Sequence, residues 1–512
     1  MRNFIVLLFI GFVISLSSCR QDFQFEPSTG DLTFSKDTIY LDTVFTNIGS
    51  STYTLKVYNK SSKDIKIPTI QLGKGQNSKY RMTVDGMTGD NNRVFHNVEL
   101  LAKDSLYVFI ELTTDVAEAN PTDFLYTDQI QFDSGSNFQK VELVTLIQDA
   151  YFLYPQRFDD GTTETLPIGE DQIYGFFLDE NDPNNGNEYE WKNDKPYVIY
   201  GYAAVPNGKT LNVHPGARIH FHADSGLIIG GGGSLKINGE LSSTEALENE
   251  VIFEGDRLEP DFSDVPGQWG AIWLTSGSTG NEINHLTIKN AVVGLLIDFN
   301  DGNYMPIKNT QIYNSANMGI YAKTAKIKGE NIVINTAGQY SIACTLGGSY
   351  DFRHCTFNNN WSSSKQLAVL VNNYYIDPNT NQQVAIKLEQ ANFYNSIIFG
   401  SNQIELFLDK STDNPDLNWT APLFSKCQIK FNNSNNQYTN NPDYAFLKNP
   451  DEIIKNGKPD FLDVFKNKLM IGADSDAINF GNDVGVSYDI LGKPRSGSFD
   501  LGAYNFIVFP GN

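Results

Sequence analysis

The chain has 512 residues and a formal net charge of −22 at pH 7, because 60 acidic residues face 38 lysines and arginines. This balance excludes nucleic acid as a partner, since cationic side chains would have to neutralise its phosphates. The length is enough for two or three domains, and beyond the N-terminus no apolar run reaches the roughly 18 residues that span a bilayer.

Residues 1–18 are typical of an export signal. An apolar run over residues 4–16 follows a positive charge and is too short to span a membrane. The run ends in LSSC, residues 16–19, which resembles the lipobox of bacterial lipoproteins. The resemblance implies cleavage before Cys19 and acylation of this residue, so that residues 19–30 form a lipidated tether. We expect the tether to reach the outer membrane, and the weakly acidic stretch after Cys19 leaves the leaflet open.

Residues 31–150 contain short runs in which apolar and polar residues alternate, with turn residues between the runs. Such runs lie at residues 37–41, 53–57, 105–110 and 140–144. Because side chains alternate across a strand, this pattern predicts an antiparallel β-sandwich. The motif Thr46-Asn47-Ile48-Gly49, followed by a strand at residues 55–59, resembles the immunoglobulin-like modules of secreted bacterial proteins. The resemblance implies a spacer or docking role for this domain.

Residues 151–196 are rich in turns and are expected to connect two domains. The acidic, turn-rich stretch at residues 179–186 has the composition of a calcium-binding loop. Pro183 occupies a position at which such a loop needs an oxygen ligand, so we expect an ordinary solvated loop. The sequence accordingly suggests no metal and no cofactor.

A repeated asparagine is the most informative pattern in the chain. It closes five similar stretches, at Asn290, Asn314, Asn335, Asn359 and Asn395, with intervals of 24, 21, 24 and 36 residues. These intervals suit successive turns of a solenoid, with a loop inserted into the last interval. The pattern predicts a right-handed parallel β-helix over residues 197–439, so the whole chain is expected to be all-β.

Two groups of segments support this fold by resemblance. Residues 211–221, 226–239, 249–255 and 266–274 resemble the first coils of bacterial β-helix proteins of the pectate-lyase-like superfamily. Residues 474–481, 489–495 and 500–506 are similar to the C-terminal segment of such proteins. The resemblance implies that residues 440–512 cap the end of the solenoid, which would otherwise expose an unpaired strand edge.

Alternation along the repeat assigns side chains to the inside or the outside of the solenoid. The predicted inward residues are Ile288, Ile312, Val333, Phe357 and Phe393, and the repeated asparagines are expected to stack at a corner and hydrogen-bond. An outward ribbon of amides and rings is the candidate binding face, because such groups suit sugar hydroxyls and sugar rings. Its residues are His285, Asn309, Tyr313, Glu330, His354, Gln390 and Tyr394. The alternative is an ordinary solvated face.

Few residues match the catalytic patterns of this fold. A hydrolase needs two carboxylates beside the scissile bond, and the sequence offers an isolated Asp-Asp pair at residues 159–160. A lyase needs acidic calcium ligands and a base, for which Asp298, Asp301 and either Lys308 or Lys323 are the candidates. No second acidic row faces them. We therefore expect a non-catalytic binding or scaffold surface for glycan or envelope-protein partners, with a polysaccharide lyase or glycoside hydrolase as the alternative.

Three cysteines follow Cys19, at positions 344, 355 and 427. An odd number leaves at least one thiol unpaired in an oxidising compartment, so a disulfide framework does not stabilise this fold. Cys355 falls on the inward side of the repeat, where packing is its expected role.

Overall fold

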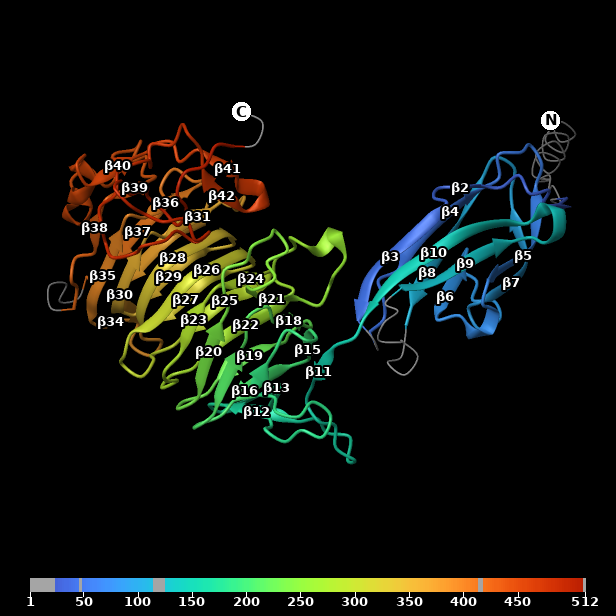
Figure 1. Ribbon diagram of the computed structural model, residues 1–512, viewed down its shortest axis with the longest axis horizontal. Coiled ribbons are helices and arrows are strands. Elements are labelled where there is room, and N and C mark those ends of the chain that lie inside the picture. Colours follow the sequence, from blue (N-terminus) through green and yellow to red (C-terminus); the bar gives the residue numbers. More distant parts are fainter. Residues whose placement is uncertain (1–23, 46–47, 114–124, 413–417, 510–512) are drawn as a thin grey trace, which may run out of the picture. The chain divides into compact units, whose positions relative to one another are not determined.

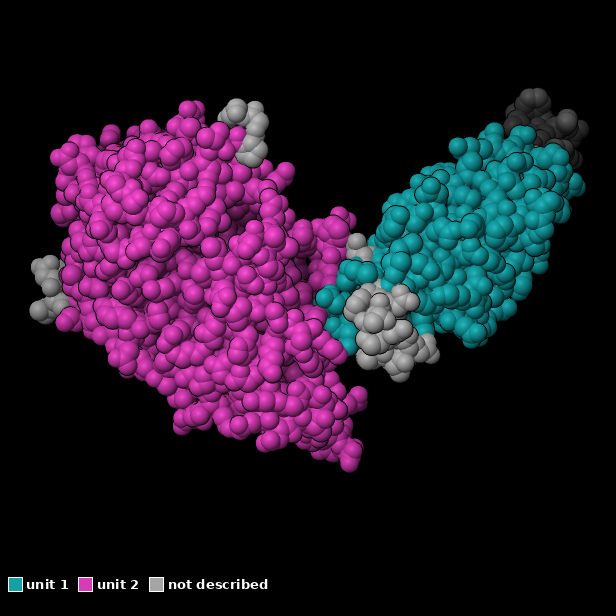
Figure 2. Space-filling view, in the orientation of Figure 1, with its two compact units in different colours: residues 1–149 teal, residues 150–512 magenta. Residues whose placement is uncertain are grey.

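The computed structural model describes residues 24–45, 48–113, 125–412 and 418–509. The predicted export signal, Cys19 and the first two residues of the motif at 46–49 lie outside these ranges. The chain divides into two compact units, residues 1–149 and 150–512, which Figure 2 shows in different colours. In the described ranges every regular element is a β-strand or a short 3₁₀ helix (Figure 1), which confirms the all-β class. No helix in those ranges is long and apolar enough to cross a membrane.

Unit 1 consists of two sheets that share one apolar core. The larger sheet has the order β1 (Glu26–Pro27), β5 (Ile65–Leu72), β9 (Leu125–Phe132), β10 (Gln139–Gln148) and β3 (Thr38–Phe45), and β7 (Val94–Leu100) also pairs with β5. The smaller sheet has the order β2 (Thr33–Phe34), β4 (Tyr53–Tyr58), β8 (Ser105–Leu112) and β6 (Tyr80–Val84). The strand pairs are antiparallel except β1–β5 and β3–β10. Alternation gives β8 a buried side, with Leu106 and Val108, and an outward side, with Tyr107 and Phe109.

Unit 2 is built from three ladders of parallel strands, which we name A, B and C. Ladder A comprises β14 (Glu190–Trp191), β17 (Thr210–Val213), β20 (Ser234–Asn238), β23 (Glu282–Asn284), the first halves of β26 (Met305–Ser315) and β28 (Lys326–Ala337), β30 (Gly348–Arg353), β35 (Leu388–Tyr394) and β38 (Leu423–Ser425). Ladder B comprises β11 (Tyr151–Leu153), β15 (Tyr197–Ile199), β18 (Arg218–Phe221), β21 (Val251–Gly255), β24 (Leu286–Lys289), the second halves of β26 and β28, β31 (Thr356–Asn359), β36 (Ile397–Gly400), β39 (Cys427–Ile429) and β40 (Ile453–Lys455).

Ladder C comprises β13 (Asp171–Phe177), β16 (Tyr202–Val205), β19 (Gly226–Ile229), β22 (Trp269–Leu274), β25 (Ala291–Ile297), β27 (Met318–Lys323), β29 (Tyr340–Thr345), β32 (Leu367–Asn372) and β37 (Leu406–Asp409). In the middle of unit 2, each circuit of the chain adds one strand to A, then to B, then to C (Figure 1). These long parallel sheets are compatible with the predicted β-helix.

The three ladders enclose one continuous apolar core. Ile288, Ile312, Phe357 and Phe393 lie in this core, as predicted. The register differs from the prediction by one residue in β28, because Ile312 pairs with Ile334 and not with Val333. A slip of one residue moves a side chain to the other face of a strand. Ile334 therefore enters the core, and Val333 packs in a separate cluster on the outer side of ladder B.

Asparagine and histidine occupy the corner between ladders A and B. His285, Asn309, Asn331, His354 and Asn395 have φ values between 47° and 52° at this corner. Asparagine and histidine enter this left-handed region more readily than most residues with a side chain. The Asn331 amide donates to Asn309 Oδ1 at 3.0 Å, and at the next corner the Asn314 amide donates to Asn290 Oδ1 at 3.3 Å. The predicted single stack of asparagines is therefore wrong, because they belong to two different corners.

Residues 440–512 do more than cap the last circuit. The 3₁₀ helix η5 (Pro442–Lys448) places Tyr444 and Leu447 in the core, and β40 extends ladder B. Residues 461–505, which we name the C-terminal cover, then pack along the outer face of ladder B. The cover contains β41 (Phe461–Asp463), η6 (Val464–Lys466) and β42 (Lys468–Ile471). Its residues Leu469, Ile490, Ala503 and Tyr504 form a cluster with Tyr313 and Val333.

The segment 151–196, predicted to be a connection, belongs to unit 2 and supplies β11, β13 and β14 to the ladders. These strands have seven residues or fewer, and two of them only two or three, so periodicity could not reveal them. Strand β12 (Thr165–Ile168) pairs with β13 and packs on the outer side of ladder C. The remaining elements are η1 (Gly75–Asn77), η3 (Gly135–Asn137), η4 (Pro260–Phe262), and the hairpin of β33 (Tyr374–Ile376) and β34 (Gln383–Ala385).

Candidate functional site

The residues of the predicted binding face do not form one surface. Glu330 and Tyr394 lie on an outward line of ladder A that also carries Lys308. The Lys308 ammonium lies 2.9 Å from a Glu330 carboxylate oxygen, so these two charges neutralise one another. Gln390 lies near the start of β35, where its amide donates to the Tyr304 hydroxyl at 2.9 Å. This part of the predicted face is half-exposed and close to electrically neutral.

The other predicted residues are withdrawn from solvent to different degrees. His285 and Asn309 occupy the corner between ladders A and B and are half-buried. Tyr313 is 8% exposed and His354 is 0% exposed, so the prediction that they form an open binding face is wrong. Tyr313 does point outward from ladder B, but the C-terminal cover packs over it. Alternation within a strand cannot reveal cover by a segment far away in the sequence.

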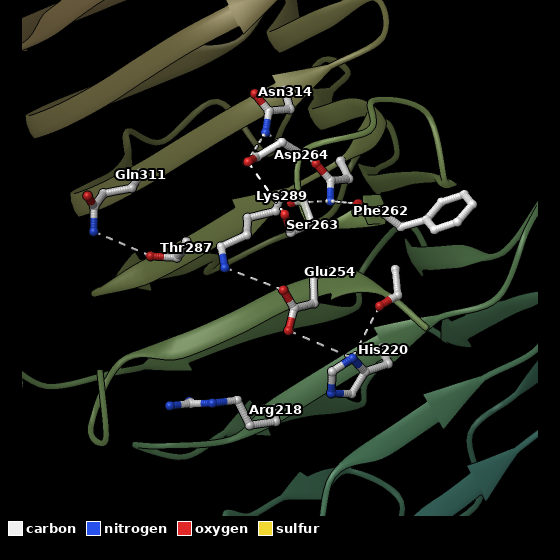
Figure 3. Close-up of polar contacts among 12 residues, drawn as sticks. Arg218, His220, Glu254, Phe262, Ser263, Asp264, Thr287, Lys289, Gln311 and Asn314 are labelled. Carbon is white, nitrogen blue, oxygen red and sulfur yellow. Dashed lines mark hydrogen bonds and ion pairs between the residues drawn. The ribbon is translucent and has the colours of Figure 1, made fainter. Parts of the chain in front are cut away.

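A polar cluster lies on the outer side of ladder B (Figure 3). Glu254 on β21 lies between His220 on β18 and Lys289 on β24, at 3.9 Å from His220 Nδ1 and 3.4 Å from Lys289 Nζ. Burial lowers the pKa of His220, although the Glu254 charge opposes this, so the imidazole is neutral at pH 7. Arg218 on the same strand as His220 donates to the Leu247 carbonyl at 2.6 Å. Glu254 thus faces basic groups, whereas a glycoside hydrolase needs a second acid.

Glu250 connects this cluster to the C-terminal cover. It is 7% exposed, and burial raises its pKa even though Thr287 and Gln311 donate hydrogen bonds to it. Gln311 Oε1 in turn accepts from the Tyr313 hydroxyl at 2.7 Å and from the Tyr504 hydroxyl at 3.3 Å. These contacts hold the cover against ladder B, which is a structural role.

The residues considered for a lyase are divided between two faces. Asp298 follows β25 on ladder C, and its carboxylate lies 2.5 Å from Lys323 Nζ. The same carboxylate accepts the indole N–H of Trp273 at 2.8 Å. Lys308 lies on ladder A, where it pairs with Glu330. Of the candidate bases, Lys323 is therefore the one beside Asp298, and it is already ion-paired with it.

Asp301 lines a pocket of about 240 Å³ between the loops that follow β22 and β25. The lining residues are Ser278, Thr279, Gly280, Asn281, Asn300, Asp301, Asn303, Tyr304 and Met305. The Thr279 hydroxyl donates to the Asp301 carboxylate, and this hydrogen bond lowers the pKa of Asp301. The Asn300 amide donates to the carbonyls of Asn303 and Lys326. The polar groups of the pocket mainly stabilise its own loops, and its volume lies below the roughly 300 Å³ at which small-molecule sites begin.

The outer face of ladder C carries a row of apolar side chains, which we name the aromatic row. Its residues, one per circuit, are Trp273, Leu296, Tyr321, Ala343, Leu370 and Phe407. Trp273, Leu296, Tyr321 and Phe407 are partly exposed. A parallel line of Val293, Met318, Tyr340 and Leu367 runs beside it. The row escaped sequence analysis because a strand that is apolar on both faces, such as AVVGLLI in β25, reads as a continuous apolar run.

Polar residues border the aromatic row on its other side. They are Asp298, Lys323, Thr345, Asn372 and Asp409. The Lys323 ammonium lies 5.6 Å from the centroid of the Tyr321 ring. Asp409 accepts hydrogen bonds from the Asn372 amide at 3.0 Å and from the Tyr374 hydroxyl at 3.1 Å. Carboxylates, amides and an ammonium are thus fixed beside the rings, where they can hydrogen-bond a ligand that lies along the row.

In the part of the chain that the structure describes, no group of three or more His, Cys, Asp or Glu residues could hold a metal ion. Cys344, Cys355 and Cys427 are unpaired and fully buried, and burial raises the pKa of each thiol. A buried thiol with a raised pKa is unreactive, so these cysteines are core side chains, as predicted for Cys355.

No protein-family model and no curated protein matches the sequence. Among solved structures, a family 123 glycoside hydrolase from Clostridium perfringens is 9% identical with a TM-score of 0.17, over 24% of this chain and 26% of that one. PapD-like domain 7 of human CEP192 is 13% identical with a TM-score of 0.15, over 26% and 96% of the two chains. The catalytic domain of a GH87 α-1,3-glucanase is 10% identical with a TM-score of 0.14, over 80% of this chain and 86% of that one. The chain thus spans about a quarter of the first hydrolase, and TM-scores this low carry no argument about function.

Proposed function

We propose that this chain is a lipid-anchored outer-membrane protein that binds a glycan chain without cleaving it. In this proposal unit 2 is a right-handed parallel β-helix whose aromatic row holds the glycan. Unit 1 is an immunoglobulin-like spacer between this surface and the acylated Cys19.

The aromatic row is the observation that supports the proposal. Neighbouring strands of a sheet lie about 4.8 Å apart, so the five steps from Trp273 to Phe407 cover roughly 24 Å. A straight row of this length suits an extended chain of sugar units. The apolar C–H faces of sugar rings pack on Trp273, Tyr321 and Phe407, and the bordering polar residues accept and donate hydrogen bonds with the hydroxyls.

The positions of the acids on this face favour binding over hydrolysis. Asp298 and Asp409 lie four circuits apart on the polar border, which is roughly 19 Å at about 4.8 Å per strand. The carboxylates of a glycoside hydrolase lie only about 5 to 9.5 Å apart. Asp298 is also ion-paired with Lys323, and Asp409 is hydrogen-bonded to Asn372 and Tyr374. Neither carboxylate is placed to act with the other on one glycosidic bond.

A protein of the cell envelope is the second candidate for the ligand. Val293, Met318 and Leu367 widen the aromatic row on one side with apolar side chains that offer no hydrogen bonds to hydroxyls. Broad apolar surfaces of this kind also mark protein interfaces. The same variants test both candidates, because the row carries the binding in each case.

The test is binding of residues 24–512 to a panel of neutral and acidic polysaccharides by affinity electrophoresis, with reducing ends assayed in parallel. Tyr321→Ala and Phe407→Ala are expected to weaken binding about tenfold each, since each removes one stacking ring. Phe465→Ala is the matched control, because this ring is 84% exposed and lies in the C-terminal cover. Retention of affinity for neutral polysaccharides in both row variants, or release of reducing ends by the wild type, would contradict the proposal.

The anchor is tested separately in cells of the native host. Incorporation of labelled palmitate into the wild type, and its loss in Cys19→Ser, would support lipidation. Unlabelled wild-type protein, or the same fractionation with membranes for both forms, would refute the anchor without bearing on the aromatic row.

A further inference from the structure

A pair of aromatic rings lies exposed on unit 1, far in sequence from the aromatic row. Tyr107 and Phe109 both point outward from β8, in the middle of the four-stranded sheet. They are 44% and 39% exposed. Their ring centroids lie 6.2 Å apart and their planes differ by 13°. Two nearly parallel rings on a flat sheet form a continuous apolar platform.

A cation accompanies the platform. Lys56 on β4 is the cross-strand partner of Tyr107. Its ammonium lies 5.1 Å from the centroid of the Tyr107 ring and 5.5 Å from that of Tyr58. Within the described ranges Lys56 forms no ion pair, although the chain has a net charge of −22. An ammonium held among aromatic rings and free of carboxylates is a complementary partner for an anionic ligand.

A small polar pocket adjoins the platform at Phe109. Its volume is about 140 Å³, and its lining residues are Arg81, Met82, Thr83, Asn92, Phe109 and Glu111. Arg81 lies 3.5 Å from Glu111 and also donates to the Thr113 hydroxyl at 3.1 Å. A guanidinium, a carboxylate, a hydroxyl and an amide thus surround a volume that is too small for a large apolar side chain. The pocket supplies hydrogen-bonding groups on the side of the platform away from Lys56.

We propose that this face of unit 1 binds an acidic saccharide. Its sugar rings stack on Tyr107 and Phe109, a uronate carboxylate meets the Lys56 ammonium, and hydroxyls reach the pocket beside Phe109. The site is independent of the aromatic row in unit 2 and therefore goes beyond the function proposed above.

The dimensions of the platform favour a saccharide over a protein partner. A stable protein interface buries about 800 Å² on each side around a desolvated apolar centre. Here the apolar part consists of the Tyr107 and Phe109 rings, with Tyr58 on the far side of Lys56, and it is flanked by Lys56, Arg81 and Glu111. Rings bordered by charged and hydrogen-bonding groups suit a ligand whose own surface alternates C–H faces, hydroxyls and carboxylates.

The test is calorimetric titration of residues 24–512 with hexagalacturonate and with the same oligosaccharide after reduction of its carboxyl groups. The double variant Tyr107→Ala/Phe109→Ala is expected to lose about tenfold or more in affinity for hexagalacturonate, because both stacking faces are removed. Lys56→Met is expected to lose about threefold in affinity for the acidic oligosaccharide and to keep its affinity for the reduced one. Tyr40→Ala is the control, since this tyrosine is 68% exposed on β3 of the other sheet.

Each outcome decides the proposal. Loss of affinity in the double variant, together with a charge-selective loss in Lys56→Met, supports it. No binding of hexagalacturonate by the wild type overturns it, and so does equal affinity of the wild type and Lys56→Met for the acidic form. Should the double variant not fold, Phe109→Ala and Lys56→Met still decide. Failure here does not bear on the aromatic row, because the Tyr321→Ala and Phe407→Ala variants test the row separately. If the site in unit 1 is real, these two variants are expected to bind hexagalacturonate there normally.

Discussion

Replacing His354 by asparagine is expected to remove an acid-sensitive contribution to the stability of unit 2. His354 occupies the corner between ladders A and B with a φ of 51°. Asn309, Asn331 and Asn395 occupy the same corner in other circuits, so asparagine suits this backbone. The imidazole is 0% exposed, and its Nε2 lies 2.9 Å from the amide nitrogen of Asn395. Burial, assisted by the charge of Arg495, lowers the pKa of His354 to about 3.

The size of the effect follows from the difference between the folded and unfolded pKa values. The ordinary histidine pKa is 6.5, so protons bind more tightly to the unfolded chain than to the folded one. The contribution of His354 to stability is therefore complete above pH 6.5 and is lost as the pH falls toward 3. The loss amounts to about 1.4 kcal/mol per pH unit, or about 2.7 kcal/mol at pH 4.5.

Urea unfolding followed by tryptophan fluorescence measures this effect in unit 2 alone, because all 5 tryptophans lie there. The free energy of unfolding of wild type and His354→Asn is compared at pH 7.5, 6.5, 5.5 and 4.5. The difference between the two proteins is expected to change by about 2.7 kcal/mol in favour of the variant between pH 7.5 and 4.5. His222→Asn, at a half-exposed histidine of unit 2, is the control. Parallel pH profiles for wild type and His354→Asn would refute the reasoning.

Three further predictions concern packing in unit 2. Arg495→Ala is expected to lower the free energy of unfolding by about 3 kcal/mol, because the buried guanidinium donates to the Gly502 carbonyl at 2.9 Å. The same variant is expected to make the C-terminal cover susceptible to limited proteolysis. Arg257→Ala, at an exposed arginine, is the control. Gly319→Ala is expected to lower the Tm by several degrees, because the added Cβ would lie 2.5 Å from the Ser341 carbonyl oxygen. In a protein of residues 24–512, which lacks Cys19, no thiol is expected to react with Ellman's reagent in the native state, and all three are expected to react in urea. A native thiol titre of one in this protein would contradict the burial of the cysteines.

The sequence was sufficient for the fold class but not for the register. Repeated apolar residues at solenoid intervals predicted long parallel sheets, and Ile288, Ile312 and Phe357 enter the core as expected. The error in β28 arose because the sequence aligns Asn335 with Asn314, whereas Asn335 pairs with Tyr313 and Thr336 takes the corner after ladder B. Asn395 lies at the other corner, between ladders A and B, so its repeat was assigned to the wrong ladder.

The candidate site was harder to predict because its exposure depends on long-range packing. Tyr313 points outward as alternation requires, but Tyr504 and Leu469, more than 150 positions further along, bury it. No periodicity within residues 461–505 indicates which of the three ladders they cover. The aromatic row could not be predicted for a different reason. Its outward residues are as apolar as the inward ones, so the strands of ladder C show no alternation that would mark an outer face.

A comparison of the three ladders gives the reason to place function on ladder C. The outward line of ladder A runs through Lys308, Glu330, Arg353 and Tyr394, and Lys308 is ion-paired with Glu330. The outer side of ladder B is occupied by the C-terminal cover and, further toward the N-terminus, by a cluster whose charges compensate one another. Ladder C instead presents Trp273, Tyr321 and Phe407 in line. Ala343 and Leu370 in the same line are buried, so the exposed part of the row consists of Trp273, Leu296, Tyr321 and Phe407. Exposed apolar surface lowers solubility, and a ligand that covers these aligned side chains explains why an acidic protein presents them.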